Sequence, residues 1–245
     1  MNFFSLFKRK ILYKLKRKID IDIDGFNNDN LDELLHHYGS DKAHNFNKTK
    51  GHGFSGFYAQ KLKFFKDKNI NILEIGSYAG ASAAAFKKYF KKSKIYCLDI
   101  NISNFKYSSK DIYVFGLDVC NKKKLSKVLD KIKFENEIES FDLIIDDGSN
   151  NLSDILFSFN MLFKKLKKKG IYIIEDFKHP NYYKYNRNID HILIDQMLDN
   201  LQDKKVFSSN IISKNDQDFF FKSIKKIDIF KGNLNDSDIS FIEKN

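Results

Sequence analysis

Acidic side chains follow three hydrophobic runs of this sequence, at positions where they could bind a cofactor or a metal ion. Asp99 ends I-Y-C-L-D, Asp146 and Asp147 end L-I-I-D-D, and Glu175 and Asp176 end I-Y-I-I-E-D. If these runs are parallel strands, their carboxyl ends meet at one edge of a sheet, which is where open α/β sheets bind ligands. The residue types at that edge indicate two chemistries, ribose recognition and coordination of a divalent cation.

A glycine turn precedes the first of these carboxylates. Gly76 and Gly80 follow the apolar-rich run 70–75, and a side chain at either position would block close approach of the backbone to a ligand. Asp99 follows at the distance where an acidic side chain accepts hydrogen bonds from both ribose hydroxyls of a nucleoside. Tyr78 replaces the second glycine of the dinucleotide fingerprint G-x-G-x-x-G, so a pyrophosphate fits poorly. The alternative is a glycine turn in an unrelated α/β protein.

The four carboxylates at 146–147 and 175–176 would repel one another unless a cation or bound protons offset their charge. Oxygen-only ligands favour magnesium, manganese or calcium over zinc. An incomplete protein shell would leave coordination positions for the hydroxyl oxygens of a substrate. The alternative is that Asp146 or Asp147 caps the next helix and Glu175 forms an ordinary salt bridge.

Hydrophobic periodicity predicts the elements that must position these residues. Strands are expected at 70–75, 95–98, 112–116, 141–147 and 171–174, of which 70–75 and 141–147 should be buried. Helices are expected at 31–38, 55–66, 80–90, 122–132, 152–166 and 190–201, with Gly170 stopping the fifth of them. Two further strands, 219–229 and 239–243, suit an antiparallel pair. The order predicts an α/β, Rossmann-like, doubly wound fold with a mostly parallel seven-stranded sheet, an antiparallel C-terminal strand pair and N-terminal helices.

A series of motifs makes a family resemblance specific. Glu74-x-Gly76-x-x-x-Gly80 resembles the first motif of class I S-adenosylmethionine-dependent methyltransferases. From the region of Leu31 to the C-terminus, the chain resembles the metal-dependent sugar O-methyltransferases of the macrocin O-methyltransferase type. The motifs that carry this resemblance are G-S-D-K (39–42), H-G-F (52–54), L-E-I-G (73–76), I-D-D-G-S (145–149) and I-I-E-D (173–176). The resemblance implies an enzyme with S-adenosylmethionine as methyl donor, Mg²⁺ or Mn²⁺, and a sugar hydroxyl as acceptor.

The resemblance also assigns roles to individual residues. The metal ligands would be Asp147, Glu175 and Asp176, and Asp118 in F-G-L-D would lie near the adenine. The catalytic residues expected are Asp147, Asn150 and His179. The remaining cofactor-binding residues belong to the glycine turn and to strand ends: Glu74, Gly76, Ser77, Tyr78, Gly80, Asp99 and Asp146.

The chain departs from the family pattern at Asn150. The family has D-D-G-S-H, whose histidine is the expected general base, and an amide cannot take a hydroxyl proton at neutral pH. The metal could acidify the bound hydroxyl so that a carboxylate or water completes the transfer, another histidine (His179 or His52) could act, or the acceptor could be a more acidic oxygen. The first two explanations are preferred jointly, with His179 as the candidate base. The alternative for His179 is a surface loop histidine before Pro180.

Composition sets the outer bounds. The 245 residues contain no Pro/Gly/Ser-rich linker or internal repeat, which predicts a single domain after the N-terminal segment 1–24. The resemblance implies that this domain, 25–245, is a methyltransferase domain. Cys97 and Cys120 give no disulfide framework and suit a reducing cytoplasm. No run of 18 or more apolar residues occurs, so no membrane-spanning helix is expected.

Residues 1–24 predict a basic amphipathic helix. Its apolar residues fall near one helical face, as in an interfacial membrane helix: Phe4, Phe7, Ile11, Leu12, Leu15 and Ile19. The alternative is a helix docked on the domain or on a second subunit. The expected location is cytoplasmic, with peripheral contact at the inner face of the membrane and homo-oligomerisation both left open. A membrane location would fit an enzyme acting on a lipid-linked glycan or a surface polysaccharide precursor.

Two other functions compete with sugar methylation. Of the net charge of +11, seven positive charges lie in residues 8–18, and the remainder is unremarkable, so nucleic acid is not an expected partner. RNA or other small-molecule methylation is the enzymatic alternative, although the N/D-P-P-Y type of motif is absent. With Asn150 in place of the base, the protein could instead be a degenerate cofactor-binding partner protein. Retention of the acidic cluster argues against that role.

Overall fold

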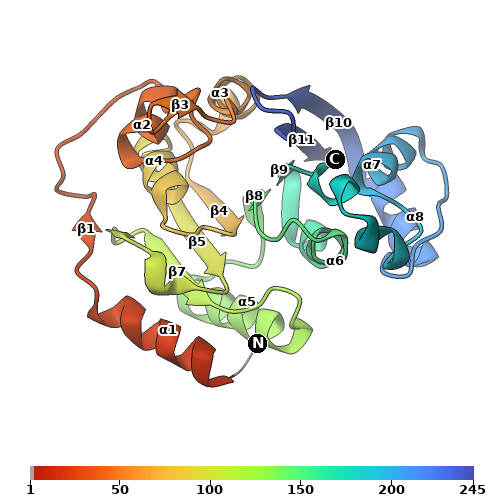
Figure 1. Ribbon diagram of the computed structural model, residues 1–245, viewed down its shortest axis with the longest axis horizontal. Coiled ribbons are helices and arrows are strands. Elements are labelled where there is room, and N and C mark those ends of the chain that lie inside the picture. Colours follow the sequence, from red (N-terminus) through yellow and green to blue (C-terminus); the bar gives the residue numbers. More distant parts are fainter. Residues whose placement is uncertain (1–2) are drawn as a thin grey trace. The chain divides into compact units, whose positions relative to one another are not determined.

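The computed structural model describes residues 3–245, and the chain divides into two compact units, Met1–Ile138 and Glu139–Asn245 (Figure 1). The first two positions of the predicted N-terminal segment 1–24 lie outside the described residues. Within residues 3–245, no helix is both long enough and apolar enough to cross a membrane. The division of the sequence into a segment 1–24 and a domain 25–245 stays a prediction.

The first unit is built on three parallel strands. Its order is β4 (Ile70–Ile75), β5 (Ser93–Asp99) and β7 (Ile112–Gly116), and Ile95 of β5 pairs with Ile72 on one side and Ile112 on the other. The apolar side chains of β4 are buried, as expected for a central strand. The helices of this unit are α2 (Leu31–Tyr38), α3 (Ser55–Leu62), α4 (Ala81–Tyr89) and α5 (Lys122–Asn136).

The N-terminal segment reaches the same unit through a second, short pairing. Helix α1 (Phe3–Leu15) is followed by β1 (Ile19–Asp20), which pairs in parallel with β6 (Tyr107–Ser108). The helix therefore ends at Leu15, well before the end of the predicted segment. A small hairpin, β2 (Asn45–Phe46) and β3 (Thr49–Lys50), lies between α2 and α3.

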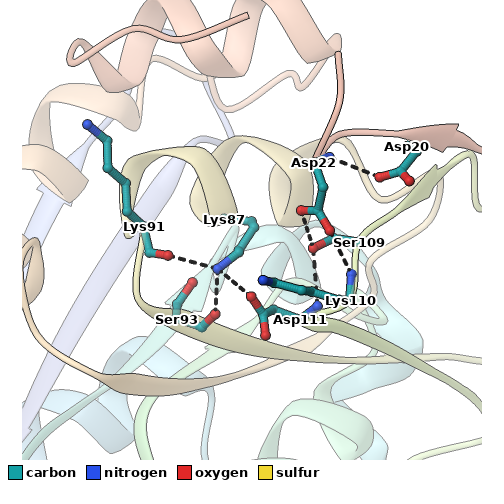
Figure 2. Close-up of polar contacts among 8 residues, drawn as sticks. All are labelled: Asp20, Asp22, Lys87, Lys91, Ser93, Ser109, Lys110 and Asp111. Carbon is teal, nitrogen blue, oxygen red and sulfur yellow. Dashed lines mark hydrogen bonds and ion pairs between the residues drawn. The ribbon is translucent and has the colours of Figure 1, made fainter. Parts of the chain in front are cut away.

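A polar network fixes the chain that follows β1 (Figure 2). Asp22 accepts hydrogen bonds from the Ser109 hydroxyl (2.8 Å) and from the backbone N–H of Lys110 (3.0 Å). Nearby, Lys87 of α4 pairs with Asp111 at 2.9 Å. Burial raises the pKa of Asp22, but the Lys110 N–H, the Ser109 hydroxyl and the charges of Lys87 and Lys110 together hold it below its usual range. The segment carrying α1 is thus anchored at its C-terminal side.

The second unit contains the remaining four strands of the large sheet. Its order is β10 (Ile224–Lys231), β11 (Asp238–Lys244), β9 (Leu166–Glu175) and β8 (Phe141–Asp146), with β8 and β9 parallel and the other pairs antiparallel. Its helices are α6 (Leu152–Leu162), α7 (Ile194–Asp203) and α8 (Lys214–Ser223). Short 3-10 turns include η2 (Ile102–Asn104) of the first unit and η3 (Phe163–Lys165), η4 (His179–Tyr182) and η5 (Lys184–Asn188) of the second.

These strands and helices confirm the predicted α/β class: seven strands, mostly parallel, with an antiparallel C-terminal pair. Three local predictions were wrong. Residues 219–223 belong to α8 instead of a strand, because Phe220 packs against Phe159 and Phe163 in the core of the second unit. Gly170 does not stop the helix that begins at Leu152; it lies inside β9. Helix α7 begins at Ile194, four residues later than expected.

Candidate functional site

The turn between β4 and α4 has the backbone geometry of a ligand-binding loop. Gly76, Tyr78 and Gly80 have φ angles of +80°, +42° and +78°. Left-handed backbone is ordinary for glycine and uncommon for tyrosine. The Tyr78 side chain is 68% exposed, so its unusual backbone serves the path of the turn and not the packing of its ring.

Gly80 is required by close packing as well as by its φ angle. A Cβ atom at this position would lie 2.4 Å from the Phe105 ring, which is buried. Glycine therefore lets the start of α4 approach the loop that follows β5. In the same loop, the backbone N–H of Lys106 donates a hydrogen bond to the carbonyl oxygen of Ala79 over 2.9 Å.

Asp99 connects the glycine turn to the end of β5. Its Oδ2 accepts the backbone N–H of Tyr78 at 2.7 Å, and its Oδ1 accepts the backbone N–H of Asn101 at 2.6 Å. Each carboxylate oxygen has a second lone pair, so both retain capacity for a further donor such as a hydroxyl. The glycine turn therefore positions Asp99, the residue predicted to accept the ribose hydroxyls.

Glu74 is a buried acid at the end of β4. It is 1% exposed, and its Oε1 has no hydrogen-bond partner in the structure. Burial raises the pKa of Glu74, whereas the charge of Lys42 and the hydroxyl of Ser82 lower it. Burial likewise raises the pKa of the Cys97 thiol, whose Sγ lies 4.0 Å from Glu74 Oε2. A buried acceptor that lacks a donor is costly unless a ligand supplies one, so Glu74 fits a cofactor with a donor group.

Lys42 is a site residue to which the sequence analysis assigned no role. It is 2% exposed and lies close enough to Glu74 for its charge to stabilise the ionised carboxylate. Lysine is almost never fully buried without a partner charge. Its place in the motif G-S-D-K, which carries the resemblance, was the signal that could have identified it.

The other predicted residues of the first unit lie in or near turns. Ser77 is 4% exposed, and its carbonyl oxygen accepts the N–H of Gly80 at 2.6 Å. Asp118 is exposed after β7, and its Oδ1 accepts the backbone N–H of Cys120 at 3.0 Å. His52 lies 3.9 Å from Asp41, in the loop before α3.

In the second unit, the strand register brings two of the predicted metal ligands to adjacent strand ends. Asp146, the last residue of β8, pairs with Ile174 of β9, so Asp147 and Glu175 are the next pair in that register. Asp176 follows with φ of +49°, a conformation that aspartate tolerates better than most residues. Glu175 is 4% exposed, and the two aspartates are partly buried.

The donor chemistry of these residues fits a hard divalent cation, because all three supply carboxylate oxygens. Their backbone positions also fit, since they lie at the carboxyl ends of neighbouring parallel strands. Across residues 3–245, no group of three or more His, Cys, Asp or Glu residues is already arranged to hold a metal ion. The fit therefore lies in donor type and strand register.

Asp146 is directed into the second unit. It is 4% exposed and accepts hydrogen bonds from the Ser158 hydroxyl and from the Tyr172 hydroxyl, the latter over 3.1 Å. Burial raises the pKa of Asp146 to about 6, although these two hydroxyls and the N–H of Gly148 lower it. These internal partners were not anticipated from the sequence, which placed Asp146 at the cofactor.

The candidate bases of the second unit differ in their surroundings. Asn150 is exposed in the loop before α6. His179 is partly buried at the start of η4, where its ring packs against Tyr183 at 5.2 Å, and its Nδ1 is buried without a hydrogen-bond partner. Its backbone N–H donates to the carbonyl oxygen of Asp176 over 2.8 Å. His179 thus lies one turn away from the predicted metal ligands.

Comparison with known proteins connects this geometry to a group of enzymes. No protein-family model matches the chain. The chain is 31% identical over 157 residues to L-olivosyl-oleandolide 3-O-methyltransferase of Streptomyces antibioticus, a match that covers 60% of this chain and 36% of that enzyme. It is 27% identical over 132 residues to demethylmacrocin O-methyltransferase of Streptomyces fradiae, covering 51% of this chain and 32% of that enzyme.

A solved structure supports the same resemblance at the level of the fold. MycE, a methyltransferase from the mycinamycin biosynthetic pathway solved in complex with Mg, SAH and mycinamycin VI, aligns with a TM-score of 0.67 and 22% identity, over 88% of this chain and 54% of MycE. The chain thus spans about a third of the length of the two curated relatives. The predicted resemblance to macrocin-type sugar O-methyltransferases is confirmed, and the fold is similar to that of MycE.

Proposed function

We propose that this chain is an S-adenosylmethionine-dependent, divalent-metal-assisted O-methyltransferase that acts on a sugar hydroxyl. The observation that carries the proposal is the cofactor half-site of the first unit. A left-handed glycine turn, an acid held at the end of the next strand and a buried acid with an unsatisfied oxygen occur together there. Both curated relatives are named O-methyltransferases, which supports the reaction class.

The residues of the first unit would recognise the two ends of the cofactor. Asp99 would accept the ribose hydroxyls, and Glu74 would accept a donor from the methionine portion. The amino acid end of this cofactor has no phosphate, which agrees with Tyr78 standing where a pyrophosphate-binding turn needs glycine. Gly76, Ser77 and Gly80 would let the backbone approach the ligand, and Asp118 would lie near the adenine.

The residues of the second unit would hold Mg²⁺ or Mn²⁺ and complete proton removal. Asp147, Glu175 and Asp176 would bind the metal, which when present supplies acidification of a hydroxyl oxygen. His179 is assigned as the general base, since Asn150 cannot accept the proton. The Nδ1 of His179 is buried and has no hydrogen-bond partner, so the fold does not use this ring nitrogen in a hydrogen bond.

The acceptor we propose is a sugar of a small molecule or glycan precursor. More specifically, we propose a precursor of a surface polysaccharide. The substrate in the name of one relative, L-olivosyl-oleandolide, carries an olivosyl sugar, which supports a sugar acceptor but not a polysaccharide. The direct experiment is transfer of a labelled methyl group from S-adenosylmethionine to a panel of free, nucleotide-linked and polymeric sugars, with and without EDTA. Metal-dependent labelling of one class supports the proposal. Labelling of RNA alone, or of nothing while the cofactor binds, would replace it with one of the two alternative functions.

A further inference from the structure

The apolar stripe of α1 faces away from the protein. Phe4, Phe7, Ile11 and Leu15 recur at helical spacing along one side of this helix, and they are 76%, 55%, 42% and 76% exposed. Large apolar side chains exposed together on a helix indicate an interaction surface. We call these four residues the outer stripe.

The opposite side of α1 is the side that packs on the first unit. Tyr13 meets the buried ring of Phe105 edge-on, at 6.3 Å between centroids. Lys18, just beyond the helix, donates from Nζ to the carbonyl oxygen of Phe105 at 2.6 Å. Tyr13 lies about 180° around the helix from Phe4, at 100° per residue, so this packing turns the outer stripe outward. The exposed stripe is therefore a consequence of how α1 is docked.

The charged residues around the outer stripe are all positive. The sequence contains no Asp or Glu before Asp20, whereas residues 8–18 contain seven Lys and Arg residues. Lys8 and Lys14 lie on either side of the stripe and are exposed. A helix with an apolar face flanked by cations, and with no acid, matches an anionic lipid surface.

A small basic cavity lies at the C-terminal end of α1. It has a volume of about 170 Å³ and is lined by Lys16, Arg17, Asn104 and Lys106, together with Tyr78, Ala79 and Phe105. No carboxylate lines it, and among the described residues its three cations form no ion pair. Lys16 also lowers the pKa of Lys18, although burial is the larger cause of that shift. The cavity therefore concentrates positive charge that the fold does not neutralise.

A second lysine-lined cavity of the first unit shows that positive charge without a neutralising carboxylate is not general on the surface of this unit. That cavity, of about 390 Å³, is lined by Lys87, Lys88, Lys91 and Lys110 but also by Asp22 and Asp111. Lys87 pairs with Asp111 at 2.9 Å, a contact visible in Figure 2, and Lys88 pairs with Asp24 at 2.7 Å. Its lysines serve the network that anchors the segment after β1. The cavity beside α1 has no such internal use.

We propose that α1 docks this protein on the surface of an anionic phospholipid bilayer. The outer stripe enters the boundary between headgroups and acyl chains, and Lys8 and Lys14 meet the lipid phosphates on either side of it. The charge of Lys16, Arg17 and Lys106 adds attraction to the anionic surface. A 13-residue helix is too short to span the bilayer, so it lies in the plane of the surface. A second copy of this chain is a poorer occupant, because a symmetric contact would bring two acid-free basic helices together.

The inference does not depend on the proposed function, since it rests on the exposure, charge and packing of α1. Its test accordingly measures lipid binding and not methyl transfer.

The experiment is flotation of the full chain with vesicles of phosphatidylcholine alone and of phosphatidylcholine with about 30% phosphatidylglycerol. We expect binding to the anionic vesicles only. Phe7→Asp with Leu15→Asp should weaken it more than about tenfold, because two apolar side chains lose their burial. Lys8→Glu with Lys14→Glu, which reverses the two exposed charges beside the stripe, should weaken it by about fivefold or more for each cation removed.

Two matched controls separate docking from nonspecific charge and hydrophobicity. Phe134→Asp removes an apolar side chain that is 89% exposed on α5, and Lys222→Glu reverses an exposed charge on α8. Both should bind like the parent, and all variants should retain the parent's circular dichroism, since the altered side chains are exposed. Inorganic phosphate that protects Lys16 and Lys106 from chemical labelling while vesicles do not bind would reassign the cavity to a free anion and overturn the proposal. Equal binding by the parent and both double variants would also overturn it, as would dimerisation without vesicle binding.

Discussion

The backbone N–H of Tyr78 lies 2.7 Å from Oδ2 of Asp99, so the residue that gives the glycine turn its path is held by the residue that ends the next strand. A second backbone donor, Asn101, occupies Oδ1 at 2.6 Å. The turn and the candidate ribose acceptor are therefore positioned by each other. A change at Asp99 should affect both the turn and the ligand.

We expect Asp99→Asn to weaken binding of S-adenosylhomocysteine by about 10- to 100-fold. The amide offers one acceptor oxygen to two backbone donors, and hydrogen bonds to a charged acceptor contribute about 1.5–3 kcal/mol. Isothermal titration calorimetry measures the affinity. Asp67→Asn, an exposed position in the same unit, is the control and should bind like the parent. Equal affinity of Asp99→Asn and the control would remove Asp99 from the cofactor site.

Gly80→Ala should lower the free energy of unfolding. The left-handed backbone at Gly80 costs a residue with a Cβ about 1–2 kcal/mol, and the 2.4 Å approach to the Phe105 ring adds about 1–3 kcal/mol of overpacking. Gly56→Ala in α3 is the matched control, because a Cβ there meets nothing within 4 Å. It should be neutral or stabilising by up to about 1 kcal/mol. Urea unfolding of both variants decides; similar losses in the two would contradict the packing described at Gly80.

Glu74→Gln should raise the free energy of unfolding at neutral pH while weakening cofactor binding. Burial raises the pKa of Glu74 in the folded state. The contribution of Glu74 to folding stability is therefore fully present below its pKa in the unfolded chain, near 4.3. It is lost as the pH rises through the higher pKa of the folded state, where the buried side chain becomes ionised. The ionised side chain then costs about 1.4 kcal/mol for each unit by which the pKa is raised.

The check on Glu74 is urea unfolding of the parent and the variant from pH 4 to pH 8. The excess stability of Glu74→Gln should grow as pH rises above the unfolded pKa and disappear toward pH 4. A variant that is less stable than the parent at pH 7 would show that the favourable charge interaction with Lys42 outweighs the burial of the carboxylate.

His179→Ala should lower kcat by about 10²–10⁴-fold, the range for removal of a general base. Its affinity for S-adenosylhomocysteine should not change, because the proposed cofactor contacts lie elsewhere. The rate is measured with whichever acceptor supports labelled methyl transfer. His191→Ala is the control, since His191 is exposed and contacts Ser208. Full activity of His179→Ala would leave proton removal to a carboxylate or water.

The sequence was a reliable guide where periodicity and strand ends decide the structure. The runs 70–75, 112–116 and 31–38 form elements with the predicted bounds. In 70–75 and 31–38 the apolar positions are also buried. Asp99 and Glu175 also lie at the carboxyl ends of β5 and β9, as predicted, whereas their roles in binding stay predictions. In these places local pattern and tertiary packing act in the same direction.

The wrong predictions arose where a local sequence pattern is compatible with two different structures. The aromatic run after Asp218 has strand-like composition, and packing of Phe220 on Phe159 decided for a helix. A cap signal was present: the Ser213 hydroxyl accepts the N–H of Asp216, whose carboxylate accepts in return. Burial of Lys42 beside Glu74 and the contacts of Asp146 with Ser158 depend on the assembled fold, which periodicity does not reveal.

The most direct measurement of the central claim is thermal unfolding with S-adenosylhomocysteine, with and without Mg²⁺, for the parent and Asp176→Asn. Asparagine tolerates the left-handed backbone of Asp176, so the substitution removes charge without straining the chain. At about 100 times its dissociation constant, a specific ligand stabilises the folded state by about 2.7 kcal/mol. We predict stabilisation by the nucleoside in both proteins, and a further increase with Mg²⁺ in the parent alone. No shift with saturating nucleoside, or the same Mg²⁺ increment in Asp176→Asn, would contradict the account.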